Sequence, residues 1–314
     1  MNHFATIASA VLVFLLSLCA PHPRGHAASV PVVKAKTLLF IQGNFRQPSD
    51  VAAGTNGRVY ILDGVNNRVS VHAAGGQRLF AFGTTGSGNG EFNFPLGIGI
   101  DDANRIYVAD SGNHRVQIFS PDGAFLSQLS TEIDRDQRKP SDPVDVAVNS
   151  RLRKCYVTDN DNHRIIIYDL VAMKPLKSEG VMGMEKKEYR FPFLLDIDDG
   201  GNLYVVEVIN TRVKVLDPDG GYLTTIGSFG VEPGRFYRPK GVAIDPAGRV
   251  LVSDSYLGVV QVFDGQGRFL SVLGDEQGAV RKFKAPAGIC VDQRRRLYVV
   301  EMLADRVQVL QLPD

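Results

Sequence analysis

The hydrophobic and polar positions of the chain follow one pattern that recurs six times. Each copy begins at a proline and contains a short apolar run, a polar turn, a second apolar run that ends in an acidic residue, and a third apolar run. The copies start at Pro48, Pro95, Pro143, Pro192, Pro239 and Pro286, a period of 47 to 49 residues. A period of this size indicates that one supersecondary unit is stacked on itself.

The second copy shows the expected elements most clearly. Its apolar runs are 96–100, 106–109 and 116–119, and a fourth run, 124–129, follows a Ser-Pro-Asp-Gly turn. Short runs rich in Val and Ile and bounded by Gly, Asp and Asn are typical of strands. The runs are apolar on nearly every residue, so both faces of each sheet must be covered. Four-stranded blades packed around an axis provide that cover.

The first run of each copy predicts where the blades crowd together. The third and fifth residues after the proline are large in copies two, three, five and six, whereas the fourth is small in five copies: Ala52, Gly99, Ala147, Ala243 and Cys290. This alternation favours blades that converge toward a crowded axis. Copy four departs from it with Asp196 at the small position.

The two ends of the repeat region predict how the ring closes. Copy six ends after its third run, 307–312, and the chain begins with an unmatched run, 37–41, that resembles the fourth runs of other copies. We expect 37–41 to complete the sixth blade, which removes an open sheet edge.

These copies resemble NHL repeats over residues 37–312. The signature appears as Asn113-His114-Arg115 and as Asn162-His163-Arg164, and the motif Gly-x-Phe-x-x-Pro appears at 90–95 and 234–239. The resemblance implies an all-β fold, a six-bladed β-propeller of four-stranded antiparallel blades. Some copies depart from the pattern: Val259 replaces Arg and Leu251 replaces Tyr in blade 5, and Glu207 and Glu301 replace Asp in blades 4 and 6.

The first residues resemble a secretory leader. Residues 4–20 are apolar and small residues follow, which predicts a signal peptide over 1–28 with cleavage near Ala27 or Ala28. An uncleaved anchor is the alternative, because the apolar length is close to the lower limit for spanning. Lipidation at Cys19 is a further alternative, although Leu18 stands where such signals want a small residue. We therefore expect a periplasmic or extracellular protein with no membrane contact apart from the leader.

Charge and cysteine content bear on nucleic-acid binding and on disulfide bonds. The formal charge of the 314 residues is +1, which is poor evidence for a nucleic-acid binder. Cys155 and Cys290 fall on opposite sides of a six-fold ring, so we predict no disulfide between them, because a disulfide needs Cα atoms within about 7 Å.

An acidic residue and an arginine five positions later form a repeated ladder. The pairs are Asp63/Arg68, Asp110/Arg115, Asp159/Arg164, Glu207/Arg212 and Glu301/Arg306. A single pair in a cleft would suggest acid chemistry, but a pair repeated around a ring favours a structural role, in which carboxylate and guanidinium satisfy each other and nearby backbone groups.

Two groups of residues are candidate metal ligands. His114 and His163 occupy equivalent turns, and the resemblance to peptide-amidating lyase propellers suggests zinc, but a third histidine is missing because His72 lies in a different strand. Asp50, Asp145 and Asp196 fall on innermost strands, where lactonase-like propellers bind calcium. Asp50 lies on a blade that is not adjacent to those of Asp145 and Asp196, and the acids lie at two depths, so we assign no cofactor and leave a divalent cation in the channel as the alternative.

The turns between second and third runs change character along the chain. They are polar in blades 1–3 and apolar in blades 4–6, and the loop between blades 3 and 4 adds two methionines. Adjacent exposed apolar turns mark interaction sites, although the long loop could also cover them. The expected binding residues are Met182, Met184, Val208, Ile209, Tyr256, Leu257, Met302 and Leu303.

The sequence supports two functions of different kinds. The first is a non-catalytic scaffold that binds a protein partner through the loop face around blades 4–6, as the resemblance to NHL platforms implies. The alternative is a metal-dependent hydrolase or lyase, with calcium or zinc, of the lactonase or amidating-lyase type. We favour the scaffold, with no nucleic acid as partner, because the leader and the neutral charge argue against an RNA-binding propeller.

Overall fold

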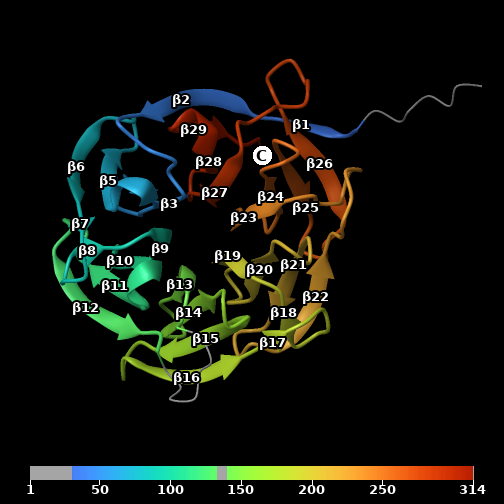
Figure 1. Ribbon diagram of the computed structural model, residues 1–314. Helices are drawn as coiled ribbons and strands as arrows, with labels where there is room; N and C mark the ends of the chain where they lie inside the picture. Colours follow the sequence, from blue (N-terminus) through green and yellow to red (C-terminus); the bar gives the residue numbers. More distant parts are fainter. Residues whose placement is uncertain (1–29, 133–139, 314) are drawn as a thin grey trace, which may run out of the picture. The chain divides into compact units, whose positions relative to one another are not determined.

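The repeating apolar runs fold into six sheets, each with four antiparallel strands, arranged around a common axis (Figure 1). The computed structural model describes residues 30–132 and 140–313, and the predicted leader over 1–28 lies outside them. Pro31–Asp314 form one compact unit. No helix within the described ranges has the length and apolarity that a bilayer span requires.

Each of the first three blades is built from four consecutive strands. Blade 1 contains β3 (Asp50–Ala53), β4 (Arg58–Asp63), β5 (Arg68–Ala73) and β6 (Arg78–Phe82). Blade 2 contains β9 (Pro95–Ile100), β10 (Ile106–Asp110), β11 (Arg115–Phe119) and β12 (Phe125–Ser130). Blade 3 contains β13 (Pro143–Asn149), β14 (Lys154–Asp159), β15 (Arg164–Asp169) and β16 (Lys174–Glu179). The strands predicted in the second copy are thus confirmed to within one residue at each end.

The last three blades repeat the arrangement. Blade 4 contains β19 (Pro192–Ile197), β20 (Leu203–Glu207), β21 (Arg212–Leu216) and β22 (Tyr222–Ile226). Blade 5 contains β23 (Pro239–Ile244), β24 (Val250–Asp254), β25 (Val259–Phe263) and β26 (Phe269–Gly274). Blade 6 takes β27 (Pro286–Val291), β28 (Arg296–Glu301) and β29 (Arg306–Gln311) from the end of the chain.

Short elements decorate the loops between and within blades. Two parallel strand pairs, β7 (Thr84–Thr85) with β8 (Glu91–Phe92) and β17 (Val181–Met182) with β18 (Glu188–Tyr189), lie in the connections that follow blades 1 and 3. Three 3-10 turns follow second strands, namely η1 (Gly64–Asn66), η2 (Ser111–Asn113) and η3 (Met302–Ala304).

The N-terminal segment closes the ring, as predicted. Strand β2 (Lys36–Gln42) pairs antiparallel with β29, with Ile41 opposite Val307. The sequence did not predict β1 (Val32–Lys34), which adds a fifth strand to blade 5 and runs parallel to β26. Consecutive residues therefore join the outer edges of blades 5 and 6 (Figure 1).

The hydrophobic core lies between neighbouring blades, which explains why the strands are apolar on both faces. One cluster joins Tyr156 and Ile167 of blade 3 to Leu195 and Val205 of blade 4. The innermost strands approach so closely that a Cβ on Gly99 would stand 2.2 Å from the carbonyl oxygen of Val146. Small residues are required there, as the alternation predicted. Cys155 and Cys290 are free, also as predicted.

Candidate binding surface on the loop face

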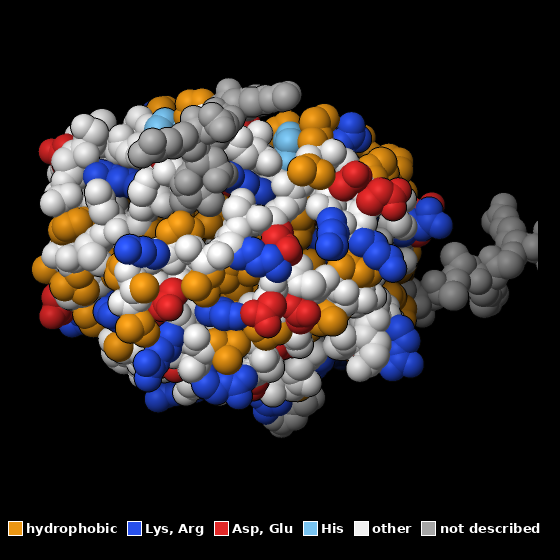
Figure 2. All heavy atoms as spheres, turned by 90° about the horizontal axis from the view of Figure 1, so that it is seen from below, with side chains coloured by type: hydrophobic (Ala, Val, Ile, Leu, Met, Phe, Trp, Pro, Cys, Tyr) orange, Lys and Arg blue, Asp and Glu red, His pale blue; other side chains and the backbone are white. Residues whose placement is uncertain are grey.

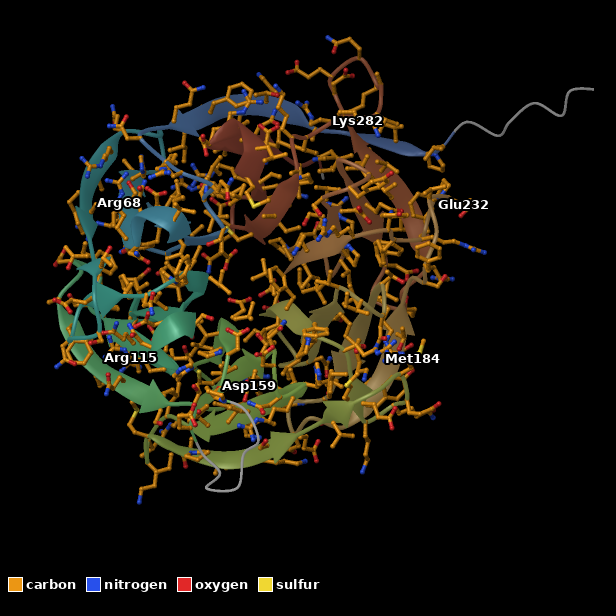
Figure 3. The ribbon with its side chains drawn as sticks, in the orientation of Figure 1. Arg68, Arg115, Asp159, Met184, Glu232 and Lys282 are labelled. Atoms are coloured by element: carbon orange, nitrogen blue, oxygen red, sulfur yellow. The ribbon has the colours of Figure 1, made fainter. Side chains whose placement is uncertain are left out.

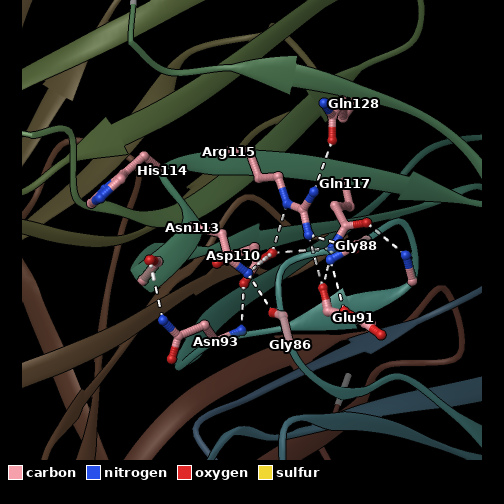
Figure 4. Close-up of polar contacts among 12 residues, drawn as sticks. Gly86, Gly88, Glu91, Asn93, Asp110, Asn113, His114, Arg115, Gln117 and Gln128 are labelled. Atoms are coloured by element: carbon pink, nitrogen blue, oxygen red, sulfur yellow. Dashed lines mark hydrogen bonds and ion pairs between the residues drawn. The ribbon is translucent and has the colours of Figure 1, made fainter.

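The acid and arginine of each ladder pair tie an inter-blade loop to the blade that follows it. In blade 2, Arg115 Nε donates to Asp110 Oδ2 at 2.9 Å, and Asp110 Oδ1 accepts the backbone N–H of Asn93 at 2.8 Å (Figure 4). The Arg115 guanidinium also donates to the carbonyl oxygens of Gly88 and Glu91. Charge-assisted bonds of this kind are strong, and here they hold backbone. The predicted structural role is confirmed in this blade.

The same bond to backbone recurs in every blade. A carboxylate at the end of the second strand accepts the N–H of the residue 17 positions earlier; these residues are Arg46, Asn93, Asp142, Arg190, Tyr237 and Lys284. Inter-blade loops and second-to-third-strand turns are thereby held together on one side of the propeller, which we call the loop face. We call the six residues the rim positions.

Blade 5 lacks the arginine and uses its carboxylate differently. Asp254 Oδ2 accepts the N–H groups of Tyr237 at 2.7 Å and Arg238 at 3.0 Å. Its Oδ1 accepts those of Tyr256 at 3.1 Å and Leu257 at 3.0 Å. Asp254 is fully buried. One carboxylate therefore fixes the backbone of two separate loops, and with it the spacing of two tyrosines.

Those tyrosines belong to an exposed aromatic cluster. The rings of Tyr237 and Tyr256 stack with centroids 4.0 Å apart and 25° between planes, and Phe229 lies 5.6 Å from Tyr237. Phe229 is 63% exposed, Tyr256 64% and Tyr237 39%. Contiguous apolar side chains of this size on a surface commonly mark a contact site. We call these three residues the aromatic cluster.

The residues predicted for binding divide into two groups. Met182, Met184, Ile209, Tyr256 and Leu303 are exposed. Val208, Leu257 and Met302 are only partly exposed, and Val208 and Met302 pack against core clusters. Figure 3 places Met184, Glu232 and Lys282 around one half of the ring, across from Arg68 and Arg115. Five of the eight predicted binding residues are therefore exposed, and the other three are half-buried.

Sequence reasoning missed Phe229 and Tyr237. A usable signal was present, because Phe236 is the consensus aromatic of the motif and is buried, and Tyr237 follows it directly. Two successive aromatics in an extended segment point to opposite sides. If the first is core, the second faces solvent.

Basic side chains accompany the aromatic cluster. Arg238 follows Tyr237, and Lys240 lies on β23 with Nζ 4.1 Å from the centre of the Phe193 ring. Burial lowers the pKa of Lys240 to about 8, and the nearby charge of Arg238 acts in the same direction. On the side of the propeller shown in Figure 2, basic, acidic and hydrophobic side chains are interspersed.

The three channel carboxylates join neighbouring blades. Asp50 Oδ2 accepts the N–H of Ile98 at 2.9 Å, and Asp196 Oδ2 accepts that of Ile244 at 2.8 Å. Asp145 Oδ2 accepts the N–H of Leu195 at 2.8 Å. Each bond runs from an inner strand to the next blade. Inner strands do not pair with one another, and these carboxylates supply the missing acceptors.

The channel carboxyls are also hard to ionise. Burial raises the pKa of Asp50 to about 7 and that of Asp196 to about 6. Burial, and then the charge of Asp50, raise the pKa of Asp145 well above its usual range, and Asp145 Oδ1 has no hydrogen-bond partner. The three line a cavity of about 170 Å³. No three His, Cys, Asp or Glu side chains in the described part of the chain are placed to hold one metal ion. The divalent cation stays a prediction.

The histidines that are candidate zinc ligands have hydrogen-bond partners within the fold. His114 donates Nδ1–H to the carbonyl oxygen of Ser141 at 2.5 Å, and His163 Nδ1 accepts the N–H of Phe191 at 3.3 Å. His72 is buried between the hydroxyl of Ser70 and the carbonyl oxygen of Gly76. These contacts support positions in the fold.

Comparison with known proteins agrees with the architecture. The NHL repeat family matches residues 45–71, 92–119 and 236–263. A streptogramin B lyase structure superposes with a TM-score of 0.63 at 11% identity, covering 88% of this chain and 97% of the other. A gluconolactonase from Xanthomonas campestris gives 0.67 at 17% identity, covering 91% and 96%.

A further solved structure has the same fold. Catalytically inactive virginiamycin B lyase from Staphylococcus aureus with quinupristin gives a TM-score of 0.61 at 15% identity, covering 86% of this chain and 82% of the other. Similarity at these identities shows the fold alone. No curated protein matches the sequence. Three segments of the chain thus match the NHL repeat family, and the chain has the fold of a six-bladed β-propeller.

Proposed function

We propose that the protein is a secreted or periplasmic, non-catalytic scaffold that binds a protein partner through the loop face around blades 4–6. The observation that carries the proposal is the aromatic cluster, in which Tyr237 and Tyr256 stack in the open at 4.0 Å. Tyrosine is enriched among residues that dominate binding energy at interfaces. Asp254 holds the backbone of both rings, so little conformational entropy is lost when a partner binds.

Neighbouring loops extend the apolar surface. Ile209 and Leu303 are exposed in the corresponding turns of blades 4 and 6, and Met182 and Met184 are exposed in the loop before blade 4. Methionine side chains adapt to irregular partners. The leader predicted over 1–28 supports an envelope or extracellular location.

A capture experiment tests this proposal. The double variant Phe229→Ser/Tyr256→Ser removes two exposed rings and leaves the core intact. The matched control Leu126→Ser/Leu176→Ser removes two exposed leucines from β12 and β16, on other blades. We expect wild type and control to recover the same partners from the native envelope, and the double variant to lose them. Equal recovery by all three proteins would contradict the proposal.

A second candidate is a metal-dependent hydrolase or lyase. It is supported by the unpartnered Oδ1 of Asp145 beside the channel cavity and by the enzyme names of two fold neighbours. Elemental analysis and thermal unfolding with calcium, zinc or a chelator decide it, because a bound ion raises the unfolding temperature. A stoichiometric ion whose removal lowers that temperature supports the enzyme. Absence of a bound ion and of any change in unfolding temperature would exclude the enzyme.

A further inference from the structure

The rim positions differ in charge around the loop face. Blades 2 and 3 carry Asn93 and Asp142, whereas blades 4, 6 and 1 carry Arg190, Lys284 and Arg46. Blade 5 carries Tyr237, with Arg238 directly after it. The repeat therefore places basic side chains on one continuous arc of the rim, over blades 4, 5, 6 and 1.

The basic residues of this arc lack carboxylate partners. Many arginines elsewhere are paired with a carboxylate, such as Arg115 with Asp110 at 2.9 Å and Arg249 with Asp245 at 2.6 Å. Among the residues that the structure describes, no carboxylate forms an ion pair with the arc residues, which are Arg46, Arg190, Arg238, Lys240 and Lys284. The ladder acids beneath them already accept bonds from arginine or backbone.

Lys240 is a partly buried member of the arc, and no counter-charge from the described residues lies beside it. It is partly buried, its ammonium group lies over the Phe193 ring, and no hydrogen-bond acceptor in the described residues contacts it. An ammonium group normally donates three hydrogen bonds. The like charge of Arg238 acts on it and no counter-charge compensates. A cation that is partly removed from water is unfavourable without a counter-charge, and an anion bound beside it would supply one.

We propose that the arc binds an acidic peptide segment of the partner, with a carboxylate at Arg238 and Lys240 and an apolar side chain on the aromatic cluster. This inference rests on the proposed function and names the chemistry of the partner. Complementary charge fixes register and steers association. The arc is short and the whole chain carries a formal charge of only +1, so a broad nucleic-acid surface is disfavoured.

Fluorescence anisotropy tests the proposal with a defined probe. The probe is a fluorescein-labelled dodecapeptide of repeated Glu-Glu-Tyr, compared with Lys-Lys-Tyr and with a labelled uridylate dodecamer. The test variant is Arg238→Gln/Lys240→Gln. The control is Arg78→Gln/Lys174→Gln, which removes the same charge from exposed positions on β6 and β16. Unfolding curves verify that both variants are folded.

We expect saturable binding of the Glu-Glu-Tyr peptide that weakens about tenfold in the test variant and less than about twofold in the control. Equal weakening in both variants, or no saturable binding to wild type, would overturn the proposal. So would tighter binding of the uridylate probe than of the acidic peptide. The capture experiment separates this inference from the proposed function. If Phe229→Ser/Tyr256→Ser loses the partners but Arg238→Gln/Lys240→Gln still recovers all of them, the proposed scaffold function is supported and the acidic-peptide inference is contradicted.

Discussion

Replacing Lys240 with methionine should stabilise the protein at pH 7. Folding lowers the pKa of Lys240 from 10.5 to about 8, and each pKa unit corresponds to about 1.4 kcal/mol. The charged side chain therefore costs up to about 3 kcal/mol in the folded state. The cation–π contact with Phe193 is lost in the variant, but a thioether packs well against an aromatic ring. We expect a net gain of about 1–2 kcal/mol in the free energy of unfolding.

The pH dependence identifies the cause of this gain. Between pH 8 and 10.5 the unfolded chain keeps the proton on Lys240 and the folded chain releases it. The free energy of unfolding of the wild type therefore increases through Lys240 as pH rises from 8 to 10.5, and the difference in stability between the methionine variant and the wild type decreases. Below pH 8 both states carry the proton, and the advantage is at its largest.

Urea unfolding at pH 7 and at pH 10 measures both effects, with Lys174→Met as the control at an exposed position. A methionine variant that is less stable than wild type at pH 7 would refute the reasoning, as would an advantage that does not change with pH. A residue whose replacement stabilises the fold and weakens peptide binding is typical of a functional site.

Three further predictions follow from buried carboxylates and from ring closure. Asp254→Ala leaves four backbone N–H groups without their acceptor, so urea unfolding should show a loss of about 3–5 kcal/mol, with reduced near-UV tyrosine dichroism; a loss under about 1 kcal/mol would contradict the role assigned to it. Folding raises the pKa of Asp50 to about 7 and that of Asp196 to about 6, so their contribution to stability is present below pH 3.8 and is lost as pH rises through 6 to 7. Thermal unfolding across this pH range should show a weaker pH dependence in Asp196→Asn than in wild type, and equal slopes would exclude the assignment. A chain that begins at Lys36 should keep a closed ring, whereas one that begins at Gly43 lacks β2 and should unfold at much lower temperature; calorimetry of the two truncations separates these outcomes, and similar unfolding temperatures would show that β2 is dispensable.

The repeat determined most of the fold at the level of sequence. Runs that are apolar on nearly every residue indicate strands buried on both faces, and six copies of one pattern fix the number of blades. The run at 37–41 could be assigned to blade 6 because its own pattern matched the strand that copy six lacks. The ladder pairs were predictable for the same reason, since each acid and its arginine lie within one hairpin.

Contacts between separate loops required the tertiary structure. Strand β1 has only three residues and no period to detect, and it is ordered by pairing with β26. Tyr237 and Tyr256 meet because a single carboxylate, Asp254, binds both of their loops. The unpaired charge of Lys240 is likewise invisible in a pattern, because pairing depends on which side chains from other blades come within a few ångströms. Local patterning encodes burial, whereas stacking and charge compensation depend on distances that only the closed ring sets.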